Sequence, residues 1–120
     1  MDQMTQNKTH AQNDTVELIR QCKQFLEEKK AENVVALDLM QVNSYLDYFV
    51  IASANSRLHA RSLAAELQSF LRTKMMLRHM PEIDTGWVVL DYNEVIFHIF
   101  LTEEREYYNL EKLWADAERL

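Results

Sequence analysis

The apolar positions of the chain follow two different spacings. From Val16 to Leu26 and from Leu63 to Leu71 they recur every three or four residues, as on the buried face of an amphipathic helix. Shorter apolar and β-branched runs, which are typical of strands, occupy residues 34–40, 46–53, 75–80, 87–91 and 94–101. The pattern therefore predicts helices that are separated by groups of strands.

Capping residues mark where the first two helices begin. Asp14, followed three positions later by Glu17, forms a capping box and predicts a helix over residues 15–30. Cys22 falls on the apolar side of this helix, so we expect a core residue rather than a nucleophile. The second helix, which ends near Lys74, has three candidate N-caps: Ser53, Asn55 and Ser56.

Turn residues organise the last third of the chain. Residues 81–86 contain the only Pro and the only Gly and predict a loop. Tyr92-Asn93 predicts a tight hairpin between the two strands that follow, because Asn tolerates the left-handed conformation that a two-residue turn demands. Thr102 is the expected cap of a final helix that runs toward Ala117.

Together these elements predict the α/β fold class, a single domain with a mixed sheet of about five strands flanked by helices. We expect the domain to span residues 14–120. Residues 1–13 are polar and lack the apolar stretch of a signal peptide, so we expect them to form a disordered tail.

Charge and cysteine content narrow the function further. The formal net charge of −6 counts against direct binding to a nucleic-acid backbone, so we expect no direct nucleic-acid readout. A single cysteine provides neither a disulfide nor a cysteine-based metal framework, and it suits a reducing compartment. No apolar run approaches membrane-spanning length. We therefore expect a cytoplasmic protein without a membrane partner.

Catalytic patterns are nearly absent. Asp38, Asp47 and Asp91 lie in strand regions, and Asp38 and Asp47 could meet across neighbouring strands. However, there is no Asp-x-Asp pair and no glycine-rich phosphate loop, which metal-dependent phosphoryl transfer usually needs. The four histidines show no metal-ligand spacing. We expect no catalytic residue, no metal and no cofactor.

An interaction surface is the remaining feature. Strand alternation places Trp87, Val89 and Asp91 on one face of the first hairpin strand, and Ile96, His98 and Phe100 on one face of the second. On the final helix we expect three residues, Leu110, Leu113 and Trp114, to be core. Residues 101–120 contain six acidic and three basic side chains, so aromatic groups beside acids favour a basic protein partner.

In these residues the chain resembles the ribosomal silencing factor family, also called the Iojap family, over roughly Thr15 to Ala117. Six segments in order carry the resemblance: Ala36-Leu37-Asp38, Asp47-Tyr48-Phe49-Val50-Ile51-Ala52-Ser53, Asn55-Ser56-Arg57, Gly86-Trp87-Val88-Val89-Leu90-Asp91-Tyr92, Val95-Ile96-Phe97-His98-Ile99-Phe100 and Arg105-Glu106-Tyr107-Tyr108-Asn109-Leu110-Glu111-Lys112-Leu113-Trp114. Ala54 and Asn93 stand where the family usually has Gly, and Ala54 would be strained if its turn needed a positive φ.

The resemblance implies a fold related to the nucleotidyltransferase palm, without that enzyme's catalytic carboxylates. It also implies a translational repressor that binds ribosomal protein fourteen on the large ribosomal subunit, and that blocks joining to the small subunit when nutrients are scarce. Homodimers occur in the family. The alternative is a metal-dependent nucleotidyltransferase-like enzyme. Strand alternation and family analogy together predict these partner-binding residues: Trp87, Asp91, His98, Phe100, Glu103, Arg105 and Tyr108.

Overall fold

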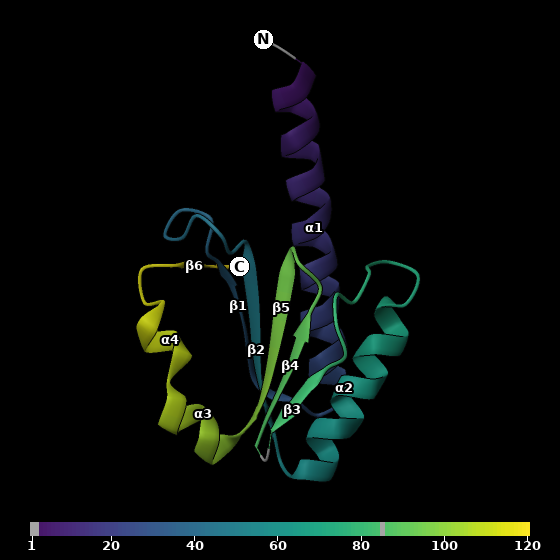
Figure 1. Cartoon of the computed structure of the whole chain (residues 1–120), viewed down its shortest axis with the longest axis vertical. Helices are drawn as coiled ribbons and strands as arrows, with labels where there is room; N and C mark the ends of the chain where they lie inside the picture. The colour runs from purple at the N-terminus through teal and green to yellow at the C-terminus, as the bar shows by residue number, and fades with distance from the viewer. Residues whose placement is uncertain (1–2, 85) are drawn as a thin grey trace.

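A six-stranded mixed sheet separates two layers of helices (Figure 1). The computed structural model describes residues 3–84 and 86–120, with side chains from Asn13 onward. The elements in chain order are α1 (Gln3–Glu28), β1 (Glu32–Asp38), β2 (Tyr48–Ala54), α2 (Arg57–Leu71), β3 (Glu82–Asp84), β4 (Trp87–Asp91), β5 (Val95–Leu101), α3 (Thr102–Tyr108), α4 (Leu110–Leu113) and β6 (Glu118–Arg119). The predicted α/β class with a mixed, helix-flanked sheet is confirmed.

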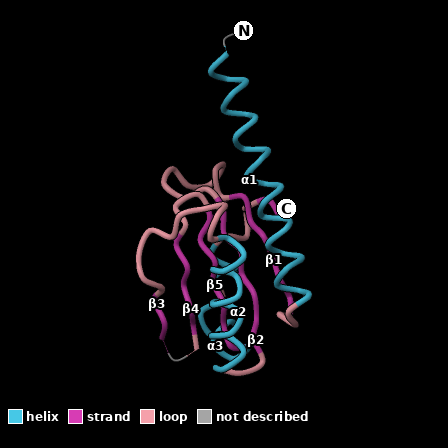
Figure 2. Tube along the Cα trace, turned by 90° about the vertical axis from the view of Figure 1, so that its right-hand side faces the viewer, coloured by secondary structure: helices cyan, strands magenta, loops and turns pink. Residues whose placement is uncertain are grey.

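The strands lie in the order β3-β4-β5-β2-β1-β6. Only β2 and β5 are parallel; the other neighbouring pairs are antiparallel. Figure 2 faces the sheet and shows β3 at one edge. All seven residues of the central strand β2 are buried, because helices cover both of its faces. In β4, near the edge, buried and half-buried residues alternate.

Each face of the sheet has its own hydrophobic core. On one face, α1 and α2 pack through Ile19, Leu26 and Leu63 against residues such as Phe97. On the other face, α3, α4 and the chain after them cover a smaller cluster built from five buried residues: Leu37, Leu39, Phe49, Ile51 and Phe100. Cys22 lies in the first core, as predicted, where burial raises the pKa of its thiol to about 12.

One local prediction is confirmed and a second is shifted by one residue. Ser56 caps α2, and its hydroxyl accepts a hydrogen bond from the His59 backbone N–H at 3.0 Å. Asn93 adopts the left-handed conformation in the hairpin turn, with φ 72°. However, Asp91 pairs with Ile96 and the Tyr92 backbone N–H donates to the Val95 carbonyl, so the turn is centred on residues 93–94 and not on Tyr92-Asn93. Ala54 ends β2 and is not among the residues with positive φ. It therefore avoids the strain that a left-handed turn would impose there.

The edges of several elements differ from the sequence prediction. Helix α1 begins at Gln3 rather than near Thr15, and its first turns extend beyond the sheet (Figure 1). The predicted helix start near Thr15 is therefore wrong. Gly and Pro, the strongest helix breakers, are absent from the stretch 1–13. The third predicted strand is also displaced. Residues 75–80 form no strand, and β3 is instead Glu82–Asp84, inside the segment that was predicted to be a loop.

The predicted final helix is two short helices. Asn109 adopts the left-handed conformation, with φ 47° and ψ 55°, and separates α3 from α4. Thr102 is the first residue of α3 rather than its cap, and Leu101 at the cap position makes no side-chain hydrogen bond. The chain then turns and adds β6 as a sixth strand beside β1. The break changes which side chains of this segment face the sheet.

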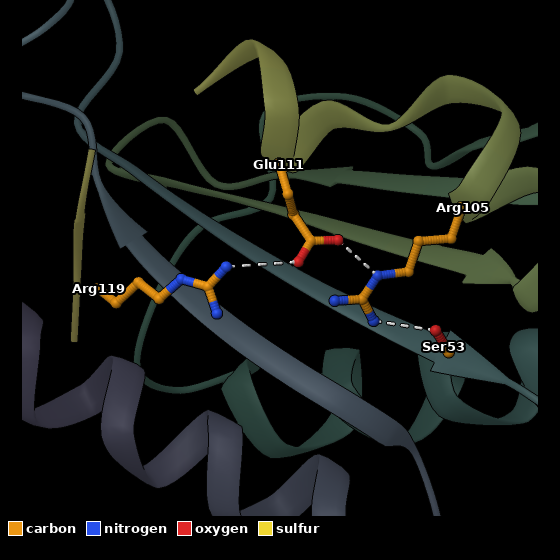
Figure 3. Close-up of polar contacts among 4 residues, drawn as sticks. All are labelled: Ser53, Arg105, Glu111 and Arg119. Carbon is orange, nitrogen blue, oxygen red and sulfur yellow. Dashed lines mark hydrogen bonds and ion pairs between the residues drawn. The ribbon is translucent and has the colours of Figure 1, made fainter. Parts of the chain in front are cut away.

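A polar cluster ties this broken segment to the sheet (Figure 3). The Arg105 guanidinium donates one hydrogen bond to Glu111 Oε1 through Nε and another to Ser53 Oγ on β2, both at 2.9 Å. Arg119 Nη2 on β6 lies 3.9 Å from Glu111 Oε2. Glu111 therefore links α3 and α4 to the last strand. The hydrogen bond from Arg105 is the main cause that lowers the pKa of Glu111 below its usual value.

Replacing Glu111 should weaken the fold in a pH-dependent way. A carboxyl group whose folded pKa is lowered stabilises the fold above its ordinary pKa and loses that contribution as pH falls through the folded value. We expect Glu111→Gln to lower the free energy of unfolding by about 1–2 kcal/mol at pH 7, because the largely buried Arg105 loses its charged acceptor. The deficit should shrink below about pH 4.

Urea unfolding of both proteins between pH 3 and pH 8 measures this difference. Glu106→Gln, a change at an exposed acid of the same segment, should leave stability within about 0.5 kcal/mol of the parent. A Glu111→Gln deficit that is the same at pH 3 and pH 7 would contradict the assignment.

Candidate partner-binding surface

Trp87 is the centre of an aromatic cluster on the sheet face that carries α3 and α4. It begins β4 and lies opposite Phe100 of β5, with ring centroids 4.8 Å apart. Tyr108, at the end of α3, approaches Trp87 to 4.7 Å. Trp87 is half-buried and Tyr108 is 44% exposed. The cluster thus offers a partner a surface of aromatic rings fixed in position.

A buried histidine holds Trp87 in place from below. The indole Nε1–H of Trp87 donates to His98 Nδ1 at 3.1 Å. Because Nδ1 accepts, the proton of the neutral ring is on Nε2, which has no hydrogen-bond partner among the described residues. Burial lowers the pKa of His98 to about 4, so the ring is neutral at physiological pH. His98 positions Trp87 rather than carrying charge.

Burial separates the predicted contact residues into two groups. Phe100 is 0% exposed and His98 is 6% exposed, so both lie beneath the surface. Trp87, Tyr108 and the exposed Glu103 can be reached from outside. Alternation along β4 and β5 predicts the shared face but not the cover that α3 adds over it. A direct contact role therefore stays a prediction for the exposed group, and the other two residues support it.

Asp91 lies at the opposite end of β4 from Trp87 and closes the hairpin. Its Oδ1 accepts from the Asn93 backbone N–H at 2.8 Å, and its Oδ2 is 3.5 Å from His79 Nε2. Arg78 Nη1 donates to Asn93 Oδ1 at 2.8 Å. Asp91 is thus engaged within the turn and is not brought together with the aromatic cluster.

Arg105 is likewise occupied within the fold, since its guanidinium binds Ser53 and Glu111. The sequence prediction placed it beside the docking face. The structure gives it the separate role of holding α3 and α4 in place. The residues next to Arg105 in the sequence do not indicate this structural role, because its acceptor Ser53 is far away in the sequence.

Two further apolar side chains of the C-terminal segment are exposed. Tyr107 is 83% exposed and stands edge-on to Tyr108, with ring centroids 5.1 Å apart. Leu113 is 70% exposed, so its predicted core position is wrong. Leu110 and Trp114 do pack on the sheet, as predicted. The break at Asn109 turns Leu113 outward, and only that asparagine could have indicated it.

Acidic groups lie on α3, the helix that contributes Tyr108 to the aromatic cluster. The first turn of α3 contains Glu103 and Glu104, and Glu106 is exposed on the same helix. Glu104 packs over Gly86, and a Cβ added at position 86 would collide with its side chain. Glu104 Oε2 is buried without a hydrogen-bond partner among the described residues. This surface is apolar at its centre and negative at its rim.

A metal-dependent active site finds no support in the geometry. Asp47 and Asp38 do approach one another at the end of the sheet opposite Trp87. The pKa of Asp47 is raised, mainly by burial and to a smaller extent by the negative charges of Glu94 and Asp38. Within the described residues, however, no three His, Cys, Asp or Glu side chains are grouped to hold a metal ion. Nor does any described helix have the length and apolar character to cross a membrane.

Comparison with known proteins gives a consistent family. The sequence profile described as "Ribosomal silencing factor during starvation" matches residues 12–120. A ribosomal silencing factor from Halalkalibacterium halodurans is 35% identical over 84% of this chain and 88% of its own length. One from Bacillus subtilis is 37% identical over 76% and 79%. A mouse protein named for mitochondrial assembly of the ribosomal large subunit is 28% identical over 76% of this chain and 42% of its own length.

Solved structures agree with this result. A crystal structure from Bacillus halodurans superposes with a TM-score of 0.70 at 35% identity, covering 82% of this chain and 93% of the other. One from Chromobacterium violaceum superposes with a TM-score of 0.76 at 25% identity, covering 82% and 84%. Sequence and fold therefore lead to one conclusion: the chain belongs to the ribosomal silencing factor family.

Proposed function

We propose that this chain is a translational repressor that binds ribosomal protein fourteen on the large ribosomal subunit and blocks joining to the small subunit under nutrient limitation. The observation that carries the proposal is the exposed aromatic cluster of Trp87 and Tyr108 with acids at its rim. The names of the matched relatives refer to ribosomal silencing and to large-subunit assembly and state no enzymatic activity.

The chemistry of the surface suits a basic protein partner. Aromatic side chains that are only half-buried gain further burial from a partner and are common as binding hot spots. Glutamates at the rim attract Lys and Arg and repel a competing acidic surface. Such a surface therefore selects a protein with exposed cationic residues around an apolar patch.

The mechanism requires no reaction. A protein that occupies the joining face of the large subunit competes with the small subunit, and its concentration relative to the dissociation constant sets the fraction blocked. We expect the chain to act in the cytoplasm, where subunits join. A homodimer, which the family resemblance allows, would have to leave the Trp87 surface free in order to bind.

Purified subunits test the central proposal. Sucrose-gradient sedimentation should show the chain migrating with the large subunit and a dose-dependent decrease in joined ribosomes, because one site cannot hold both ligands. A chain that stays at the top of the gradient would sink the proposal. So would a chain that sediments with the large subunit without lowering the joined fraction.

Truncation of the aromatic cluster tests the docking face. We expect Trp87→Ala to weaken binding by about 2 kcal/mol or more, which is roughly 30-fold in Kd. Tyr108→Ala, at an exposed position that the fold tolerates, should weaken it by about 1–2 kcal/mol. Binding to labelled large subunits measures both dissociation constants.

Tyr45→Ala is the matched control, since Tyr45 is exposed in the loop before β2, at the far end of the sheet from Trp87. It should bind like the parent. Circular dichroism and thermal unfolding identify any variant that is misfolded. If folded Trp87→Ala and Tyr108→Ala both bind with the parental Kd, the docking face has been assigned to the wrong surface.

A further inference from the structure

Helix α2 carries an arginine stripe that the aromatic surface does not use. Arg57, Arg61 and Arg72 are all exposed. Arg57 and Arg61 are one turn apart, and Arg72, at the C-cap, returns to within roughly 60° of the same direction at 3.6 residues per turn. The buried side of α2 consists of other residues: Ala60, Leu63, Ala64, Leu67 and Leu71. The three guanidinium groups therefore follow one exposed side of the helix.

Among the residues that the structure describes, these arginines take part in no ion pair. Glu66, the single acid in α2, pairs with Lys29, the residue that follows α1, with Nζ and Oε1 3.5 Å apart. The positive charge of the stripe is thus left for solvent or for a partner outside the chain.

The position of Arg57 also runs against helix electrostatics. The first turn of α2 contains no acid, and Arg57 is its first residue. A helix N-terminus is already partly positive, so a cation there costs stability where Asp or Glu would add to it. Residues 55–81 contain five of the 13 Lys and Arg residues but only one of the 19 Asp and Glu residues. The chain concentrates positive charge here despite its negative total.

The stripe begins next to the docking face. Arg57 and Arg61 line a hollow of about 220 Å³ whose other walls include Asp84, Gly86 and Trp87. This hollow lies at the end of β4 where the aromatic cluster also begins, although α2 and α3 are on opposite sides of the sheet (Figure 1). A large partner that touches Trp87 would therefore reach the arginines around the end of the sheet.

We propose that the arginine stripe of α2 is a second contact surface, which binds the phosphate backbone of RNA in the large ribosomal subunit beside the site of the aromatic cluster. The inference rests on the proposed function. Phosphodiester oxygens are the acceptors that a row of unpaired guanidinium groups fits best. Backbone contacts of this kind position a protein and read no base sequence.

The two surfaces then have different tasks. Acids and aromatic rings on the α3 side select a basic protein, while arginines on the α2 side bind the polyanion next to it. RNA is a better occupant than an acidic protein because phosphates repeat along a backbone. Arg57 and Arg61, about 6 Å apart along the helix axis, can engage successive phosphates. A net charge of −6 conceals this division, since it averages over both sides.

Salt dependence tests the contact. The change Arg57→Gln with Arg61→Gln should weaken binding to intact large subunits about tenfold at 100 mM KCl and lower the slope of log Kd against log salt by about 1–2. The matched control, Arg20→Gln with Lys30→Gln, removes the same charge from two exposed positions of the α1 region. The control should keep the parental affinity and slope.

Purified ribosomal protein fourteen separates the two surfaces. The arginine variant should bind it with the parental Kd, since the stripe touches RNA and not this protein. Weaker binding to the isolated protein would overturn the inference. If the parent binds large subunits and both double variants share its Kd and salt slope, the inference fails and the proposed function stands. If the parent chain does not bind large subunits, both the proposed function and this inference are wrong.

Cross-linking identifies the neighbour directly. Ala65 is exposed on α2 between Arg61 and Arg72. In Ala65→Cys the introduced thiol can be labelled with benzophenone, because the native Cys22 is buried. Irradiation of the complex should attach the chain to RNA of the large subunit. Attachment only to ribosomal protein would overturn the assignment to phosphate.

Discussion

The parallel pairing of β2 with β5 is the contact on which the rest of the molecule depends. Seven residue pairs join strands from the two halves of the chain, from Tyr48–Val95 to Ala54–Leu101. Because this pair is central, both of its faces must be covered, and the chain supplies a helical layer for each. The pairing also places Ser53 where Arg105 can reach it. The same strand pairing therefore organises the core and holds the helices that carry the aromatic cluster.

The two covered faces have become chemically different. The layer formed by α3 and α4 is short, broken at Asn109 and attached through the Arg105–Glu111 cluster, and it leaves Trp87 and Tyr108 partly open. The layer formed by α1 and α2 buries its apolar side deeply and presents arginines outward. Under the two proposed contacts, this separation of charge would give selectivity for a site where a basic protein lies next to polyanionic RNA.

Periodicity in the sequence predicts the elements well where each strand or helix is long. It predicts the β4–β5 hairpin and the face that Trp87, His98 and Phe100 share, because alternation along a strand has a period of two. It fails for β3 and for the Asn109 break. A three-residue edge strand has too few positions to show a period, and helix periodicity continues across a single left-handed residue.

The candidate site shows a second limit of sequence reasoning, which concerns depth. A pattern assigns a residue to a face but cannot say what covers that face. Phe100 and His98 are on the predicted face, yet α3 and Trp87 cover them. The arginines of α2 could not be singled out from the sequence for a different reason. Their charge is visible in the sequence, but only the absence of ion pairs among the described residues distinguishes them from ordinary surface charges.

The Trp87–His98 pair fixes the geometry of the proposed docking surface. Trp87 is held by a hydrogen bond and by contacts with two further rings, so little side-chain entropy remains to be lost on binding. Protonation of His98 would remove the acceptor of that bond, but burial holds its pKa to about 4. The hydrogen bond between Trp87 and His98 therefore persists through mild acidification. Under the proposed function, the fraction of large subunits that is occupied would then follow the amount of protein.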